Sequence, residues 1–226
     1  MGSDFSKEDS FHFPTMDKRN LNTLRDYLRN YNPPEGCGGC INILLFGLVG
    51  AGKSSIINTF LSALDPRGAT ITCVPTGNNP VCLTPELRSF DPDSDISSYP
   101  VIPENVIHGV AFVFDINTIE NISDDKMNVF QELETTVVQK YIHRVVIGTQ
   151  FDLLGMPEKH NAWIYEFKPL QQKFENLAVR TGMERRSMFV VSNRWRGDQI
   201  EMIKCILALY VLDNMVRNID RFLRVV

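Results

Sequence analysis

The sequence predicts an α/β fold of three layers around a mostly parallel central sheet. Four apolar runs rich in Val, Ile and Phe are flanked by polar segments, as is typical of strands buried on both faces of a sheet. Between them lie segments with the apolar spacing of helices. The chain has 226 residues, 43% of them hydrophobic, and is long enough to bury one substantial core. The four predicted strands cover residues 41–46, 106–114, 144–148 and 188–191.

Helices are predicted where apolar residues recur every three or four positions. The first ends at Asn32-Pro33-Pro34, because proline cannot continue a helix. Ser123 is the predicted N-cap of the third helix, and Gly182 ends the fourth. The last helix is apolar on more than one face, so we expect it to contact the core and also the first helix or a partner protein. The predicted helices cover residues 17–31, 54–64, 123–141, 169–180 and 198–223.

This alternation of strands and helices also predicts the domain organisation. Residues 1–35 are expected to form an N-terminal tail and helix, and residues 36–226 the main domain. Strands separated by helices of this length are joined by right-handed crossovers, which makes the sheet mostly parallel and covers both of its faces. Ligands of such sheets bind at the carboxyl ends of the strands. Functional residues are therefore expected at that edge.

A glycine-rich turn lies between the first strand and the second helix. It matches G-x-x-x-x-G-K-S, the P-loop or Walker A pattern, in which backbone N–H groups wrap phosphates and a helix N-terminus adds its dipole. Lys53 is expected to bridge the β- and γ-phosphates, Ser54 to bind Mg²⁺, and the N–H of Ser55 to reach the α-phosphate. The predicted phosphate-binding residues are Gly47, Leu48, Val49, Gly50, Ala51, Gly52, Lys53, Ser54 and Ser55.

Two later strand ends predict recognition of a guanine base. Asp152 can accept hydrogen bonds from guanine N1–H and from the 2-amino group, whereas adenine has no N1 proton. It stands 99 residues after Lys53, where small GTPases carry [NT]-K-x-D, so we expect a P-loop NTPase fold of the small-GTPase type. A helix-capping role for Asp152 is the alternative. The predicted base-binding residues are Thr149, Gln150, Asp152, Ser192, Asn193 and Arg194.

The sequence carries few of the residues that GTP hydrolysis needs. Hydrolysis requires an aspartate for Mg²⁺ and a group that positions water. The nearest D-x-x-G candidate for metal binding is Asp91, in Asp91-Pro92-Asp93-Ser94, where serine replaces glycine. Pro85 interrupts the preceding apolar run, which leaves open whether the second and third strands of this fold are lacking or degenerate. We therefore expect slow hydrolysis or none. The candidate switch threonines are Thr70, Thr72 and Thr76.

Composition bounds the partners and the location. The 23 Lys and Arg against 27 Asp and Glu give a net charge of −4, which provides no basic excess for nucleic acid. An odd number of scattered cysteines, five, suits a reducing compartment, so a cytoplasmic location is expected. The N-terminal MGSDFS fits the pattern for N-myristoylation, and membrane contact is expected only if Gly2 carries that acyl chain.

Residues 43–58, ILLFGLVGAGKSSIIN, and 107–115, IHGVAFVFD, resemble the interferon-induced protein 44 family. The preceding LRNYNPP at 28–34 is similar to that family as well. The resemblance implies a cytoplasmic guanine-nucleotide-binding domain with an interferon-linked antiviral or antiproliferative role. This chain departs from the family pattern in lacking its D-T-x-G-type motif and in carrying Gln150 where a lysine would pack on the purine. The departures weaken the expectations of hydrolysis and of guanine selectivity.

Three hypotheses follow for the function. The leading one is a protein that binds GTP or GDP with Mg²⁺ and acts as a switch or assembly module in innate immunity, through a protein partner or self-association. The alternative is a non-enzymatic protein-interaction module with a vestigial nucleotide site. An ATP-dependent P-loop kinase is the third, but it needs an arginine-rich lid, and the pair Arg185-Arg186 precedes the last strand.

Overall fold

The computed structural model describes residues 14–34, 40–73, 89–90, 106–156, 163–193 and 201–225. These residues form a five-stranded sheet in the order β2-β1-β3-β4-β5, in which every neighbouring pair of strands is parallel. The strands are β1 (Ile43–Phe46), β2 (Ser89–Phe90), β3 (Gly109–Asp115), β4 (His143–Thr149) and β5 (Met188–Val191).

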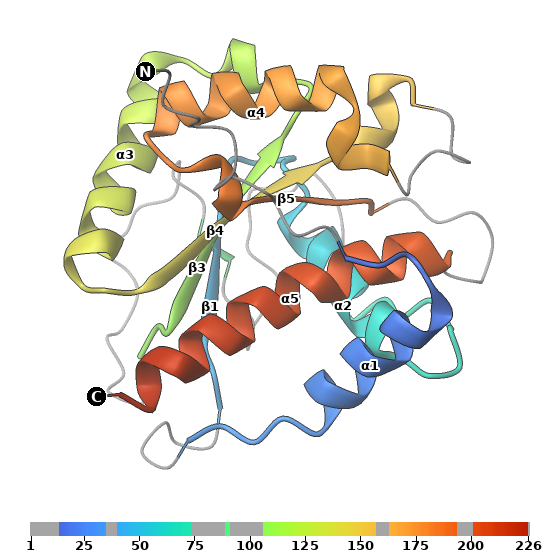
Figure 1. Ribbon diagram of the computed structural model, residues 1–226. Helices are drawn as coiled ribbons and strands as arrows, with labels where there is room; N and C mark the ends of the chain where they lie inside the picture. The colour runs from blue at the N-terminus through green and yellow to red at the C-terminus, as the bar shows by residue number, and fades with distance from the viewer. Residues whose placement is uncertain are drawn as a thin grey trace, which may run out of the picture.

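Helices cover both faces of the sheet (Figure 1). Helices α3 and α4 lie on one face and α2 and α5 on the other, with α1 packed against α5 and α2. The predicted three-layer α/β fold with a parallel sheet is confirmed. Within the described residues, no helix has the length and apolar character needed to cross a membrane. The helices are α1 (Lys18–Arg29), α2 (Lys53–Leu64), α3 (Asp124–Gln139), α4 (Lys168–Thr181) and α5 (Met202–Leu223).

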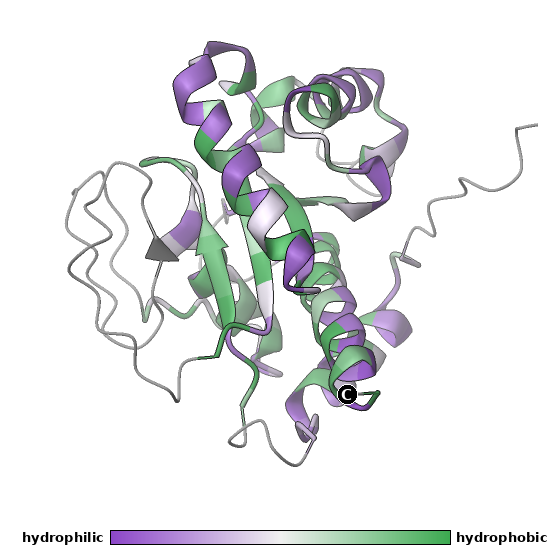
Figure 2. Cartoon of the chain, turned by 90° about the vertical axis from the view of Figure 1, so that its left-hand side faces the viewer, coloured by the Kyte–Doolittle hydropathy of each residue, from purple (hydrophilic) through white to green (hydrophobic). Residues whose placement is uncertain are grey.

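The strand side chains alternate between two separate cores. Ala111 and Val113 of β3 face the core shared with α2 and α5, whereas Phe112 and Phe114 face the core shared with α3 and α4. Because both faces are buried, β3 is apolar at successive positions instead of alternating with polar residues. Figure 2 shows the hydrophobic strands inside and hydrophilic residues on the outer sides of the helices.

The helix starts agree with the sequence predictions only in part. Ser123 stands at the N-cap of α3, but its side chain makes no capping hydrogen bond. The last helix begins at Met202, four residues later than predicted, because Glu201 before it has an extended backbone. The predicted end of α4 is confirmed, since Gly182 follows it in the left-handed conformation with φ 74°.

The strand predicted at 106–114 is shorter at its start. Its pairing with β1 begins only at Gly109, opposite Ile43, the first residue of β1. Val106 and Ile107 lie before the paired residues and are exposed. The apolar pattern of the sequence therefore overestimates this strand, because its neighbour sets where the ladder starts.

The edge of the sheet beside β1 carries a very short strand. Ser89 and Phe90 form β2 and pair with Leu45 and Phe46, the last two residues of β1. Whether the second and third strands of this fold are lacking or degenerate stays a prediction. The residues on either side of it, including Asp91, lie outside the described part of the chain.

Candidate functional site

The P-loop lies at the carboxyl edge of the sheet, between β1 and α2. Gly50 and Gly52 have left-handed φ angles of 81° and 97°, which side-chain-bearing residues rarely adopt. A β-carbon at Gly47 would stand 2.3 Å from the backbone oxygen of Val113. Glycine at position 47 therefore lets the loop leave β1 in close contact with β3.

Lys53 and the two serines after it form the first turn of α2. The Lys53 ammonium donates to the carbonyl oxygens of Gly47 and Leu48, at 2.6 Å and 3.0 Å, so the side chain curls back over the loop. Ser54 and Ser55 are half-buried. Backbone N–H groups in a first helical turn have no acceptor within the helix and lie at the positive end of its dipole. This turn therefore offers both donors and positive charge to an anion.

The ends of β4 and β5 contact the P-loop directly. The fully buried Thr149 donates its hydroxyl proton to the carbonyl of Ala51 at 2.7 Å. The side-chain amide of Asn193 lies 3.5 Å from the carbonyl oxygen of Gly52, and its Oδ1 accepts a hydrogen bond from Thr59 of α2 at 3.0 Å. Three segments that the sequence predicts to act together are thus brought together around Gly52.

Asp152 lies in the short 3₁₀ helix η3 (Phe151–Leu154), which directly follows β4. Phe151 is fully buried and anchors this turn, while Asp152 is half-buried with its Oδ1 shielded from solvent. Ser192, the first residue after β5, is fully buried, and its hydroxyl has no hydrogen-bond partner within the described residues. Buried hydroxyls are nearly always bonded, so the Ser192 hydroxyl has hydrogen-bonding capacity that the described residues do not use.

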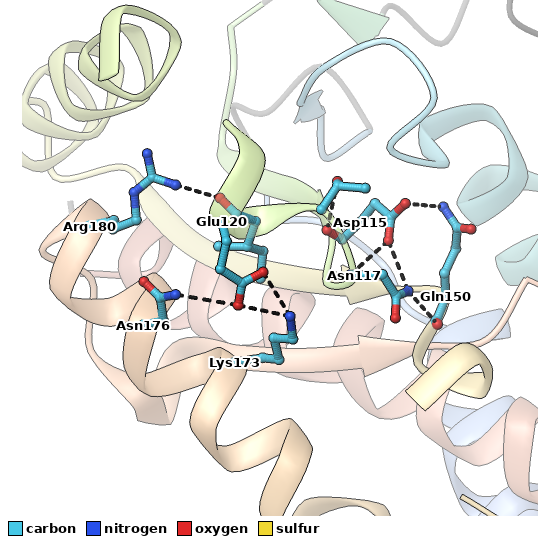
Figure 3. Close-up of polar contacts among 9 residues, drawn as sticks. Asp115, Asn117, Glu120, Gln150, Lys173, Asn176 and Arg180 are labelled. Carbon is cyan, nitrogen blue, oxygen red and sulfur yellow. Dashed lines mark hydrogen bonds and ion pairs between the residues drawn. The ribbon is translucent and has the colours of Figure 1, made fainter. Parts of the chain in front are cut away.

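Gln150, another predicted base-binding residue, is held by Asp115, the last residue of β3, and by Asn117 just after that strand (Figure 3). Its side-chain amide donates to Asp115 Oδ2 at 2.8 Å, and its carbonyl accepts a hydrogen bond from the side chain of Asn117 at 3.0 Å. Sequence reasoning missed Asp115 and Asn117 as parts of this site. The one signal for them is that Asp115 ends a strand at the carboxyl edge, where ligands of such sheets bind.

Some predicted residues are not among those that meet at the P-loop. Thr70 and Thr72 are exposed on the segment after α2. That segment is held near the helix by a hydrogen bond of 2.7 Å from the Ile71 N–H to the Ser62 hydroxyl. The predicted residues that lie outside the described part of the chain are Gly2, Thr76, Asp91 and Arg194.

Similar curated proteins bear the name interferon-induced protein 44. The Mus musculus protein is 24% identical over 251 residues, which cover 88% of this chain and 60% of that protein. The Pan troglodytes and Homo sapiens proteins are 24% and 23% identical over 255 residues, covering 89% of this chain and 57% of each relative. The chain thus spans somewhat less than two thirds of the length of these relatives.

Two solved structures are similar to parts of this chain. One is a probable GTP-binding protein engB, 13% identical, with a TM-score of 0.44 over 80% of this chain and 98% of that chain. Another is Toc33 from Arabidopsis thaliana in complex with GDP and Mg²⁺, 12% identical, with a TM-score of 0.47 over 92% and 95%. No family model matches the chain. The curated relatives nevertheless confirm the predicted resemblance: this chain is similar to interferon-induced protein 44 over most of its length.

Proposed function

We propose that this chain binds a guanine nucleotide, GTP or GDP with Mg²⁺, at the carboxyl edge of its sheet. The observation that carries the proposal is the meeting of three segments at Gly52, where Thr149 and Asn193 both reach the P-loop. A P-loop alone would hold the phosphates of any nucleotide. Here the two segments with candidate base-reading residues are bonded to that loop.

The P-loop is suited to phosphates and Mg²⁺. The Lys53 ammonium, which contacts two loop carbonyls, would gain by exchanging these neutral partners for charged phosphate oxygens. Mg²⁺ is usually held by one or two protein oxygens together with substrate phosphates. Ser54, in the first turn of α2, would supply a protein oxygen.

Asp152 is the proposed reader of the base. Its carboxylate would accept two hydrogen bonds from guanine, whereas adenine would leave it with a desolvated charge and no N1 proton to accept. The half-buried position of Asp152 makes that penalty larger than it would be on an open surface. The buried hydroxyl of Ser192 and the amide of Asn193 would complete the base-binding end.

We propose slow or absent GTP hydrolysis. The sequence has serine in place of the D-x-x-G glycine after Asp91, and no glutamine follows where a water-positioning group would stand. Phosphate release from GTP should therefore stay at or below about 10⁻⁴ per second, the range of an unaided Ras-type site. Faster release that disappears in Lys53→Ala would contradict this part of the proposal.

The likeness to interferon-induced protein 44 supports a role as a switch or assembly module in innate immunity. A second candidate function, an interaction module with a vestigial nucleotide site, is favoured by one observation. Gln150 stands where a lysine would pack on the purine, and its amide is bonded to Asp115 instead. Light scattering with GDP, with a GTP analogue and without nucleotide separates the two: a switch changes its oligomeric state or partner binding with nucleotide, whereas the interaction module does not.

Calorimetric titration with GDP, GTP and ATP tests the proposed binding. We expect saturable binding of one GDP, with ATP at least about tenfold weaker, a difference of roughly 1.4 kcal/mol. Lys53→Ala should abolish binding, and Lys140→Ala, an exposed lysine after α3, should leave it unchanged. Equal affinities for ATP and GDP would remove the role of Asp152, and failure to bind any nucleotide would overturn the proposal.

A further inference from the structure

Asp115, Asn117 and Gln150 form a hydrogen-bonded group that the P-loop motif does not account for (Figure 3). We call these three residues the Asp115 cluster. One carboxylate oxygen of Asp115 accepts from the backbone N–H and the side-chain amide of Asn117, at 2.9 Å and 3.0 Å. The other oxygen accepts from the Gln150 side chain at 2.8 Å, and Asn117 also donates to the Gln150 carbonyl at 3.0 Å. Gln150 is thus held at its side chain and at its backbone.

The backbone of Gln150 has a conformation that needs such support. Its φ of 58° and ψ of 26° lie in the left-handed region, which residues other than glycine seldom adopt. Strained conformations of this kind persist only where the surroundings enforce them. Asp115 contacts the Gln150 side chain and Asn117 contacts its backbone carbonyl, so both can support this conformation.

Gln150 connects two parts of the candidate site. The residue before it, Thr149, is fixed to the P-loop carbonyl of Ala51. The turn after it carries Asp152, and the Leu153 N–H closes that turn by donating to the Gln150 carbonyl at 3.0 Å. The dihedral angles of Gln150, together with the burial of Phe151, therefore set where Asp152 lies relative to the P-loop.

We propose that Asp115 is a positioning residue for base recognition: by holding Gln150 in the left-handed conformation, it fixes the turn that carries Asp152. Asp115 acts through Gln150 and does not contact the base. The inference rests on the proposed function, because the effect it assigns to Asp115 is control of guanine-nucleotide affinity and of the preference for guanine over adenine.

A neighbouring group provides a matched control (Figure 3). Glu120 in the 3₁₀ helix η2 (Ile119–Asn121) lies in the same connection after β3 and accepts hydrogen bonds from Lys173 at 2.7 Å and 2.8 Å and from Asn176 at 3.4 Å. These bonds join η2 to α4. Replacing Glu120 thus removes as many polar contacts as replacing Asp115, but none that involve Gln150.

Nucleotide titration of three variants tests the positioning role. Asp115→Ala should weaken GDP binding by about tenfold, the effect of losing one hydrogen bond to a charged group. It should also lower the ratio of GDP affinity to ADP affinity. Glu120→Ala should change neither. Adding Gln150→Gly to Asp115→Ala should restore GDP affinity to within about threefold of wild type, because glycine adopts positive φ without support.

Hydrogen exchange of the chain without nucleotide provides a second readout. The Leu153 amide should exchange faster in Asp115→Ala than in wild type or in Glu120→Ala, because the turn it closes would loosen. Wild-type GDP affinity in Asp115→Ala, or unchanged exchange at Leu153, would overturn the inference. Failure of the glycine substitution to restore affinity would overturn the role of the left-handed conformation. Failure of the proposed function has a separate signature: the wild-type chain itself would bind no guanine nucleotide.

Discussion

At Gly52 the chain combines a backbone requirement with a packing requirement. Its φ of 97° suits glycine, and a β-carbon there would stand 2.9 Å from the Asn193 side chain and 3.3 Å from Thr149. Gly68 also has a positive φ, 70°, but a β-carbon there would meet nothing within 4 Å. A side chain at Gly68 would meet backbone strain alone, whereas a side chain at Gly52 would also crowd Asn193 and Thr149.

Gly52→Ala should harm nucleotide binding, whereas Gly68→Ala should not. Both substitutions put alanine into a left-handed conformation and should lower the free energy of unfolding by about 1–2 kcal/mol. Only Gly52→Ala also displaces Asn193 from the P-loop. Urea denaturation gives the first quantity and GDP titration the second. Equal GDP affinities in the two variants would show that Asn193 does not need its position beside the loop.

Among the secondary-structure elements, α1 is fastened to α5 by polar and aromatic contacts. The Arg217 guanidinium lies 3.8 Å from the centre of the Tyr27 ring, a cation–π contact. The Tyr31 hydroxyl, just beyond α1, donates to Asp220 at 2.8 Å. Burial, and then this hydrogen bond, raise the pKa of Tyr31, so the hydroxyl stays a donor through the neutral range. Helix α1 also contacts α2. Arg25 of α1 donates a hydrogen bond of 2.7 Å to the carbonyl of Ala63, near the C-terminal end of α2.

Tyr31→Phe should destabilise the fold without changing nucleotide affinity. Removing the hydrogen bond to Asp220 should lower the free energy of unfolding by about 0.5–1.5 kcal/mol. Tyr141→Phe, at a side chain 77% exposed, should stay within about 0.5 kcal/mol of wild type. Because α1 contacts the end of α2 opposite the P-loop, GDP titration should give the wild-type value for both variants. A stability of Tyr31→Phe equal to that of Tyr141→Phe would contradict the role of this contact.

For the whole molecule, two histidines beside the starts of β3 and β4 link stability to pH. Burial lowers the pKa of His108, and its Nδ1 accepts a hydrogen bond from the Asn42 N–H at 2.9 Å, which requires an unprotonated nitrogen. Burial also lowers the pKa of His143; a hydrogen bond with Asn214 opposes this effect, and the charge of Arg144 adds to it. The folded state thus disfavours the protonated form of both rings.

The free energy of unfolding should therefore fall as the pH decreases through about 6.5, the histidine pKa of the unfolded chain, because unfolding then takes up protons. Hydrogen bonds from Arg67 and Arg224 lower the pKa values of the carboxylates Asp65 and Asp220. The stability that such carboxylates contribute to the folded state is lost only near pH 4 and below.

Urea denaturation at pH 7.5 and 5.5 measures this dependence. In the double variant His108→Asn, His143→Gln the difference between the two pH values should shrink, while Asn at position 108 keeps an acceptor near the Asn42 N–H. An unchanged difference in the double variant would mean that other groups cause the pH dependence.

The general fold could be predicted from the sequence because buried parallel strands and amphipathic helices leave local patterns. The first and last residues of a strand were harder to predict where pairing with a neighbouring strand determines them. Val106 and Ile107 match a strand pattern but have no β1 residue to pair with. Likewise, Pro85 interrupts the apolar run before Asp91, which left a strand there open, and the pairing of Ser89 and Phe90 with Leu45 and Phe46 comes from the fold.

The candidate site also has a part with a local sequence pattern and a part without one. The P-loop and Asp152 were predictable because their chemistry requires particular residues at fixed spacing. The Asp115 cluster was not, because its central hydrogen bond joins residues 35 positions apart and depends on a left-handed glutamine that propensity does not predict. Contacts between segments, which only the fold creates, supplied this part of the site.

Exchanging the Asp152 carboxylate for an amide tests the proposed guanine recognition most directly. In Asp152→Asn the side chain keeps one acceptor and gains a donor, which mismatches the two N–H groups of guanine but complements xanthine, which has an oxygen in place of the 2-amino group. We predict that GDP affinity falls at least about a hundredfold while the diphosphate of xanthosine binds more tightly than GDP. Asp124→Asn, at a side chain 99% exposed, should bind both nucleotides as the wild type does. Wild-type GDP affinity in Asp152→Asn, with no gain for the xanthosine nucleotide, would contradict recognition of guanine by this residue.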